Sequence, residues 1–431
     1  MRRRITAIVA VATVLVAAAC TAKGSGNSGN GAVTVEFVTV QQPTETIPTI
    51  LQSVMDGFAT SHPGSTLKLT YVPQDQLDQK LQLLSAQDAL PEMFFAPGTP
   101  AAQTDMAKSG KALNLEDALT QLGVFDKMDP TAAQIMRNQQ GGKVYALPLE
   151  LNIEGFWYNK KIFSDNSLQP PKTWDDLVTT AAALKAKNIQ PFSASGLQGW
   201  PLTRLVSGYL FRSLGPDALQ KVASGQAKLT DPSYVKAAQA VADLGAKGYF
   251  GPGFATLDYS PAVDEFIQGK AAMFYMGSWA IGDYNDASRN TMGGPGNIGY
   301  FPFPTVSGGA GSVDQIPMNA GLPIMMSAKK YKDNPGLADW LKYLAQNYGD
   351  TAMKLKGAIS GFPATNAPAD LPPTTVLVTN QIKAAKQPLG WFESLMPAKG
   401  QDVAQKNAAG LVNGSVSPAD FMAKVQAALT S

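Results

Sequence analysis

The sequence predicts an α/β protein with more than one compact lobe. Two observations support this: strand and helix patterns alternate along the chain, and the chain is long enough for two domains. Val33, Val35 and Phe37 alternate with polar residues, as residues of a half-buried strand do. Apolar residues then recur at helical spacing over 47–58, and a second strand-and-helix pair follows over 67–84. This alternation favours a largely parallel sheet covered by helices. About 410 residues follow the N-terminal segment, enough for two domains with proper cores.

Three later segments predict further helices. Thr173 stands three residues before Asp176, which predicts a capping box at a helix start. Apolar residues at helical spacing over 337–348 predict an amphipathic helix. Near the end, Ser417 followed by Pro418 predicts the N-cap and the first turn of a final helix.

The N-terminus predicts export from the cytoplasm. Arginines at positions 2–4 precede an apolar run over 5–19. That run is shorter than the roughly 20 apolar residues of a membrane-spanning helix, and it has the length of a secretory h-region. We therefore predict a signal peptide over residues 1–19.

Cys20, the only cysteine of the chain, directly follows three alanines. This arrangement resembles a bacterial lipobox, in which the cysteine becomes the lipid-modified first residue of the mature chain. Position 17 is Ala, where lipoboxes usually have Leu or Val. Residues 20–32 are rich in Gly, Ser and Asn and predict a flexible tether. We expect lipidation at Cys20 and attachment to the outer face of the cytoplasmic membrane; a free secreted protein is the alternative.

Composition excludes several kinds of chemistry. The formal charge is +2 with no basic run after the signal segment, which argues against a nucleic-acid partner. One histidine, His62, and one cysteine cannot build a His/Cys metal cluster, and His62 is expected in a helix-to-strand turn. We expect no catalytic residue, metal or cofactor. Acidic residues are plentiful, so a carboxylate-based glycosidase remains the enzymatic alternative.

Segments spread over the mature chain resemble, in order, the family-1 extracellular solute-binding proteins, the maltodextrin-binding-like sugar receptors of ABC importers. The segments are 58–64 (FATSHPG), 142–148 (GKVYALP), 156–163 (FWYNKKIF), 170–177 (PPKTWDDL), 269–273 (GKAAM) and 277–280 (GSWA). Each is a weak signal alone, and their joint order and spacing are specific.

The resemblance implies the two-lobed type II periplasmic-binding-protein fold, in which each lobe is a sheet flanked by helices and the ligand cleft lies between the lobes. By this likeness the chain crosses between lobes near 150–153, 300–304 and 357–362. Lobe I would hold residues 33–150 and 303–356. Lobe II would hold residues 151–302 and 357–431.

Aromatic residues in loops are the first candidates for ligand contacts, because the apolar face of a sugar ring stacks on aromatic rings. Trp279 follows Gly277 in a segment whose family counterpart lies at the cleft. The other candidates lie beside Gly or Pro: Trp200, Trp391 and Phe362. By contrast, Trp157, Trp174 and Trp340 fall on predicted strand or helix faces and are expected in the core.

Sugar hydroxyls need polar partners, which we expect at strand ends and crossings. The candidates are Glu150 and Asn152 after the GKVYALP strand, Gln42 and Glu45 before the first helix, Asp75 after the second strand, and Asn319 before Gly321. Loop or capping roles are the alternative for each; Glu45, for example, could complement a helix N-terminus.

The function implied is that of an extracytoplasmic solute-binding lipoprotein. It would capture a sugar, preferably an oligosaccharide, by cleft closure and deliver it to the permease subunits of an ABC importer, acting as a monomer. A secreted glycoside-acting enzyme and a sensor or adhesin lipoprotein on the same fold are the alternatives.

Overall fold

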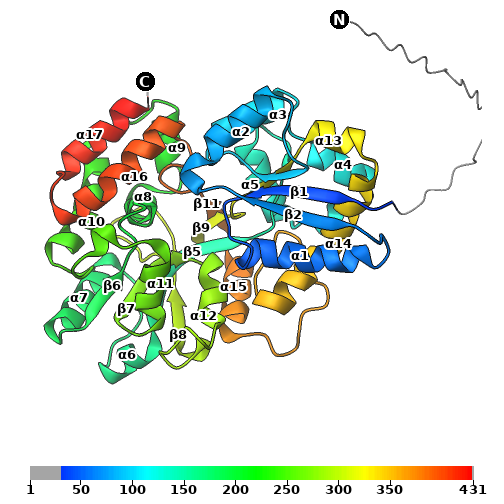
Figure 1. Cartoon of the computed structure of the whole chain (residues 1–431). Coiled ribbons are helices and arrows are strands. Elements are labelled where there is room, and N and C mark those ends of the chain that lie inside the picture. The colour runs from blue at the N-terminus through cyan, green and yellow to red at the C-terminus, as the bar shows by residue number, and fades with distance from the viewer. Residues whose placement is uncertain (1–30, 430–431) are drawn as a thin grey trace, which may run out of the picture.

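The described part of the chain forms two mixed sheets, each accompanied by helices (Figure 1). The computed structural model describes residues 31–429. The predicted signal peptide, Cys20 and all but the last two residues of the predicted tether lie outside these described residues. Within 31–429, no helix is both long enough and apolar enough to cross a membrane. The predicted α/β class is confirmed.

The first sheet has the strand order β2-β1-β3-β10-β4. β1 pairs in parallel with β2 and β3, whereas β10 is antiparallel to β3 and β4. Its strands are β1 (Thr34–Thr39), β2 (Thr66–Tyr71), β3 (Met93–Phe95), β4 (Ala146–Leu147) and β10 (Ile324–Met326). The helices around it are α1 (Thr46–Ala59), α2 (Leu77–Ala86), α3 (Pro100–Lys108), α4 (Leu115–Gln121), α5 (Pro130–Gln139), α13 (Ala328–Asp333) and α14 (Gly336–Lys356).

The second sheet has the order β11-β9-β5-β7-β6, and β8 also pairs with β5. Its strands are β5 (Asn152–Asn159), β6 (Gln190–Ser193), β7 (Ala271–Gly277), β8 (Ile298–Phe301), β9 (Gln315–Asn319) and β11 (Gln387–Leu389). The remaining helices are α6 (Lys160–Asp165), α7 (Trp174–Ala186), α8 (Trp200–Leu214), α9 (Ala218–Ala223), α10 (Pro232–Ala246), α11 (Tyr259–Ile267), α12 (Ile281–Asn285), α15 (Pro373–Ala384), α16 (Ala398–Asn413) and α17 (Pro418–Ala428). Short 3₁₀ turns are η1 (Gln74–Gln76), η2 (Phe125–Lys127), η3 (Phe254–Thr256), η4 (Ser278–Ala280) and η5 (Pro295–Asn297).

The chain changes sheets three times: between β4 and β5, between β9 and β10, and between β10 and β11. The first two crossings lie side by side. It leaves the first sheet at β4 and enters the second at β5, across residues 148–151. It comes back between β9 and β10, and Asn319 at the end of β9 pairs with Asn152 at the start of β5. β9 lies within the range 303–356 that was expected in lobe I, yet it is hydrogen bonded in the second sheet. The lobe boundaries themselves stay a prediction.

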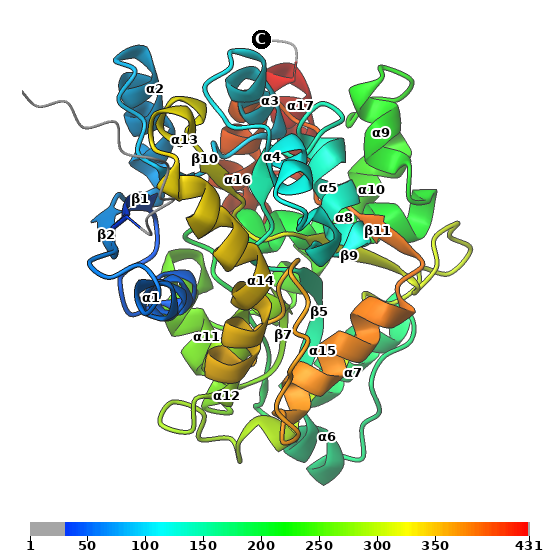
Figure 2. The same ribbon diagram turned by 90° about the vertical axis from the view of Figure 1, so that its right-hand side faces the viewer.

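The helix starts predicted from sequence are confirmed. Thr173 Oγ1 accepts from the Asp176 backbone N–H at 3.1 Å, and the Asp176 carboxylate accepts from the Thr173 N–H at 3.0 Å, so the capping box of α7 is complete. Ser417 caps α17 in the same way, by accepting from Asp420 N–H at 3.1 Å. The expected apolar faces of α1 and α14 are buried, and these two helices pack against each other (Figure 2).

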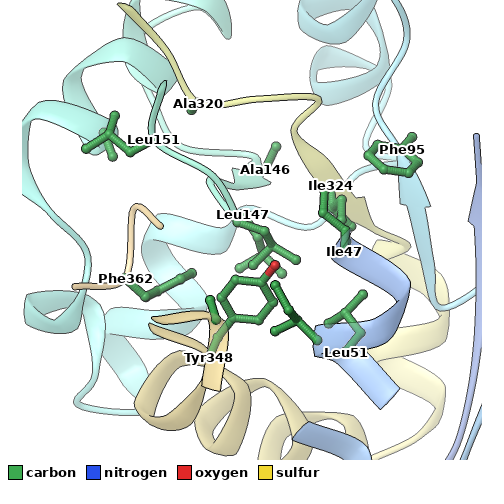
Figure 3. Close-up of a cluster of buried hydrophobic side chains, with 14 of the residues drawn as sticks. Ile47, Leu51, Phe95, Ala146, Leu147, Leu151, Ala320, Ile324, Tyr348 and Phe362 are labelled. Atoms are coloured by element: carbon green, nitrogen blue, oxygen red, sulfur yellow. The ribbon is translucent and has the colours of Figure 1, made fainter. Parts of the chain in front are cut away.

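Two clusters of buried apolar side chains hold the structure together. The first cluster includes side chains from both sheets, and Figure 3 shows a part of it in which Leu147, Ile324 and Tyr348 lie close together. The second gathers around β6, β7, α8, α10, α16 and α17. The tryptophans expected in the core, Trp157, Trp174 and Trp340, are all buried, which confirms that prediction.

Candidate functional site

Three part-exposed tryptophans from distant segments lie close together, two of them against one arginine and the third against one of these two. Trp200 is the first residue of α8, Trp279 lies in η4 directly after β7, and Trp391 lies in the turn after β11. The rings of Trp200 and Trp279 meet edge to face, with centroids 5.6 Å apart. The guanidinium carbon of Arg204 lies 5.3 Å from the ring centroid of Trp200 and 4.7 Å from that of Trp391. The structure thus brings together the three tryptophans predicted to contact ligand.

Two glycines make this arrangement possible. Gly199 precedes α8 with a φ of +71°, and a Cβ there would lie 2.0 Å from the carbonyl oxygen of Gln405. At Gly277, a Cβ would lie 1.9 Å from the ring of Trp279. Any larger residue at either place has to displace a neighbour, so both glycines fix where the tryptophans beside them lie.

Arg204 is held by two buried carboxylates. Its Nη1 is hydrogen bonded to Glu154 Oε1, and its Nε lies 3.9 Å from Glu393 Oε2. The other oxygen of Glu393 accepts from the hydroxyl of Thr203. Both glutamates are almost fully buried: Glu154 is 1% exposed and Glu393 is 2% exposed. Burial raises the pKa of Glu154 and of Glu393, and the charge of Arg204 opposes this rise at both.

A second cluster of hydrogen-bonded polar side chains lies where β5 meets β9 and η4. Asn319 Nδ2 donates to Glu154 Oε1 at 3.2 Å, and its Oδ1 accepts from Gly321 N–H at 2.9 Å. The hydroxyl of Ser278 donates to Asn152 Oδ1 at 3.1 Å. The same hydroxyl accepts from the backbone N–H of Ile153 in β5. The predicted residues Asn152 and Asn319 are therefore buried members of the network that reaches Arg204.

Glu150 lies at the crossing itself. Its carboxylate accepts from Asn152 Nδ2 at 3.3 Å and packs so closely on Gly321 that a Cβ there would be 2.2 Å from Oε2. Burial raises the pKa of Glu150 to about 7. Tyr259 and Tyr348 lie near enough for this carboxylate to raise their pKa values further, in addition to the larger effect of burial.

The other predicted site residues lie apart from the tryptophans. Gln42 and Glu45 are exposed before α1, where Glu45 accepts from the Gln42 backbone N–H. Phe362 is 1% exposed and packs in the first apolar cluster (Figure 3). The side chain of Asp75 is outside the part of the chain that the structure describes. Ligand contact by these four residues stays a prediction.

Sequence reasoning missed the three charged residues at the centre of the site. A signal existed for each of them. Arg204 follows Trp200 by one helical turn, Glu154 follows Asn152 on the same face of a strand, and Glu393 follows Trp391 by two residues. The pairing of these three segments is long-range, however, and no local spacing indicates it.

The arrangement combines apolar ring surface with hydrogen-bonding groups. Among residues 31–429, no group of three or more His, Cys, Asp or Glu side chains could hold a metal ion. His62 lies in the turn after α1, as expected, with its ring stacked on Phe58 at 3.9 Å between centroids. Ring surface next to hydrogen-bonding groups is suited to a partly apolar, partly polar small molecule.

The family follows from comparison with known proteins. The family described as bacterial extracellular solute-binding protein matches residues 42–351 of this chain. That range is more than half of the 431 residues, and the chain belongs to this family. The resemblance inferred from the sequence segments is thereby confirmed.

Curated relatives carry names of the same kind. The multiple sugar-binding protein of Streptococcus mutans is 26% identical over 332 residues, covering 75% of this chain and 73% of that protein. An uncharacterized ABC transporter extracellular-binding protein of Pyrococcus horikoshii is 27% identical over 59% of this chain, and the match spans 57% of its length. A sn-glycerol-3-phosphate-binding periplasmic protein of Yersinia enterocolitica is 28% identical over 50% of this chain and 48% of its own.

Solved structures agree in fold over nearly the whole chain. A chitin oligosaccharide binding protein superposes with a TM-score of 0.80 and 28% identity, covering 93% of this chain and 98% of that one. The structure of the solute-binding protein RafE in complex with raffinose superposes with a TM-score of 0.72 and 20% identity, covering 92% and 98%. The expected type II periplasmic-binding-protein fold is confirmed.

Proposed function

We propose that this protein captures a carbohydrate, preferably an oligosaccharide, outside the cytoplasm and delivers it to an ABC importer. The family match supports capture of a solute, and two similar proteins have names that specify sugars or a sugar oligomer. The observation that carries the proposal is the gathering of Trp200, Trp279 and Trp391 around the polar network of Arg204. Ring surface next to fixed hydrogen-bonding groups is what the apolar face and hydroxyl rim of a pyranose require.

We further propose that the ligand contacts come from the residues predicted by sequence: Trp279, Trp200, Trp391, Glu150, Asn152, Asn319, Gln42, Glu45, Asp75 and Phe362. Lobe I (33–150 and 303–356) and lobe II (151–302 and 357–431) would close on the ligand, because closure removes water from both partners and gives the importer a state to recognise. The exposed position of Gln42 and Glu45 before α1 is compatible with contacts made on closure.

The proposal includes anchoring. Cys20 would carry the lipid, and residues 20–32 would tether a monomeric receptor to the outer face of the cytoplasmic membrane beside its permease. The sequence pattern of residues 1–20 supports this part. Enzymatic action is not part of the proposal, since the family and its relatives have the names of binding proteins.

A thermal-shift screen tests the proposed function. The mature chain is heated with raffinose, stachyose, xylotriose and triacetylchitotriose, with amino acids and polyols as controls. A ligand that binds only the native state raises its melting temperature, by an amount that grows with concentration. We expect at least one sugar to do so, and Trp279→Ala to remove most of that shift. Absence of any shift with sugars contradicts the substrate class, and hydrolysis of a sugar during incubation contradicts a binding-only role.

A further inference from the structure

One nitrogen of the Arg204 guanidinium, Nη2, has no hydrogen-bond partner in the described part of the chain, and its position defines what it can bind. Nη1 is engaged by Glu154 and Nε faces Glu393, while the guanidinium lies over the rings of Trp200 and Trp391. Nε and Glu393 Oε2 are buried without a hydrogen-bond partner, so they face each other and not solvent. Within residues 31–429, Nη2 has no partner and is not among the buried atoms. Arg204 therefore presents the two N–H groups of Nη2, held in a fixed position beside the tryptophan rings.

The charge around this donor is not positive. One guanidinium faces two carboxyl groups, those of Glu154 and Glu393, and both are nearly fully buried. With both carboxyl groups ionised the cluster has a net negative charge, and with one of them protonated it is neutral. A phosphate or carboxylate at Nη2 would lose its hydration without meeting a net positive charge. A hydroxyl or amide oxygen needs only the hydrogen bond.

We infer that Arg204 is a ligand-contacting, specificity-determining residue that selects neutral sugars, through hydroxyl or acetamido oxygen atoms, and rejects anionic sugars and sugar phosphates. Glu154 and Glu393 are positioning residues that hold the guanidinium and cancel its charge. The inference rests on the proposed function and narrows its substrate class. The distinction between neutral and anionic ligands matters among the relatives of this chain, because one of them is named for binding sn-glycerol 3-phosphate, an anion.

Isothermal titration of the full mature chain tests the inference. Neutral probes are raffinose, stachyose, xylotriose and triacetylchitotriose; anionic probes are trigalacturonic acid and sn-glycerol 3-phosphate. We expect a neutral probe to bind at least about 100-fold more tightly than either anion. Arg204→Lys keeps the charge and removes the planar donor, so neutral-sugar affinity should fall about 10- to 100-fold. Glu393→Gln should narrow the ratio of neutral to anionic affinity by about tenfold.

Matched controls separate a contact from a folding defect. Arg137, in α5, is also paired with a carboxylate, that of Glu116, and lies over an aromatic ring, that of Phe125 instead of a tryptophan. Arg137→Lys and the corresponding carboxylate change Glu92→Gln, at a buried glutamate paired with Lys330, should leave affinity unchanged. Each variant's own melting temperature without ligand reports its folding.

The possible results are distinct. If neutral sugar binds and Arg204→Lys binds it equally well, or if an anion binds as tightly as the neutral probe, the inference is overturned and the proposed function stands. If no probe of either kind binds the wild-type chain, the proposed function fails and the inference fails with it.

Discussion

Trp200 and Trp279 pack edge to face at an angle of 61°, and this contact joins the start of α8 to the end of β7. Such pairs are a favoured aromatic geometry and fix the direction in which each ring faces. Both rings are part-exposed, so the pair offers apolar surface next to the polar network of Arg204. Ligand binding should therefore depend on the placement of these rings as much as on their presence.

Gly277→Ala tests that dependence without removing a tryptophan. The added methyl group would lie 1.9 Å from the Trp279 ring, so the ring has to move. We expect sugar affinity to fall at least about tenfold, equivalent to the loss of about 1.4 kcal/mol, as measured by isothermal titration. Gly296→Ala is the matched control, because a Cβ there meets nothing within 4 Å and affinity should not change. Equal affinity of both variants would contradict the role given to the Trp279 ring.

Glu150 predicts a pH dependence of stability. Its pKa in the folded chain is about 7, above the 4.5 of an ordinary glutamate, so the folded state binds more protons between these values. The contribution of this group to the free energy of unfolding should then fall as pH rises from about 5 to 8, by at most about 3.4 kcal/mol. Glu150→Gln should flatten this part of the profile. Parallel thermal unfolding of both proteins from pH 5 to pH 8 measures the difference, and identical profiles would refute the assignment.

Thr173→Ala should weaken the fold without touching the site. The change removes the hydroxyl that caps α7 and accepts from Asp176 N–H. We expect a loss of about 1 kcal/mol in the free energy of unfolding, measured by urea denaturation, with sugar affinity unchanged. A large loss of affinity would mean that α7 communicates with the site, which its capping role does not predict.

Cys20→Ser tests the anchor. Cys20 is the only thiol of the chain, so the serine variant has no residue that could take the lipid. Wild-type protein is expected in the membrane fraction of expressing cells and the variant in the soluble exported fraction. Equal distribution of the two would favour a free secreted protein over a lipoprotein.

The elements of the fold were predictable because their signals are local. The period-two pattern of β1, the apolar face of α1 and the capping box at Thr173 each depend on neighbours within a few residues. The order of the sheets is different, since β9 pairs with β5 across more than 150 residues. Local periodicity contains no information about such pairing, and the position of β9 had to come from the structure.

The tryptophans of the site could be predicted from sequence because each lies near a glycine in a predicted loop. A glycine within two residues of Trp200, Trp279 and Trp391 indicated rings held in turns, and all three are brought together in the structure. Phe362 has the same kind of neighbours, but its ring is buried, because a Gly-Phe-Pro turn is compatible with either direction of the ring. Glu154 and Glu393 were missed because an acidic residue alone does not indicate whether a distant arginine will meet it.

The most direct test of the central claim is calorimetric titration of the mature wild-type chain with the four neutral oligosaccharides, alongside Trp279→Ala. We predict saturable one-to-one binding of at least one sugar, weakened at least about tenfold in the variant, which corresponds to about 1.4 kcal/mol. Absence of binding by every sugar, or equal binding by the variant, would contradict the account.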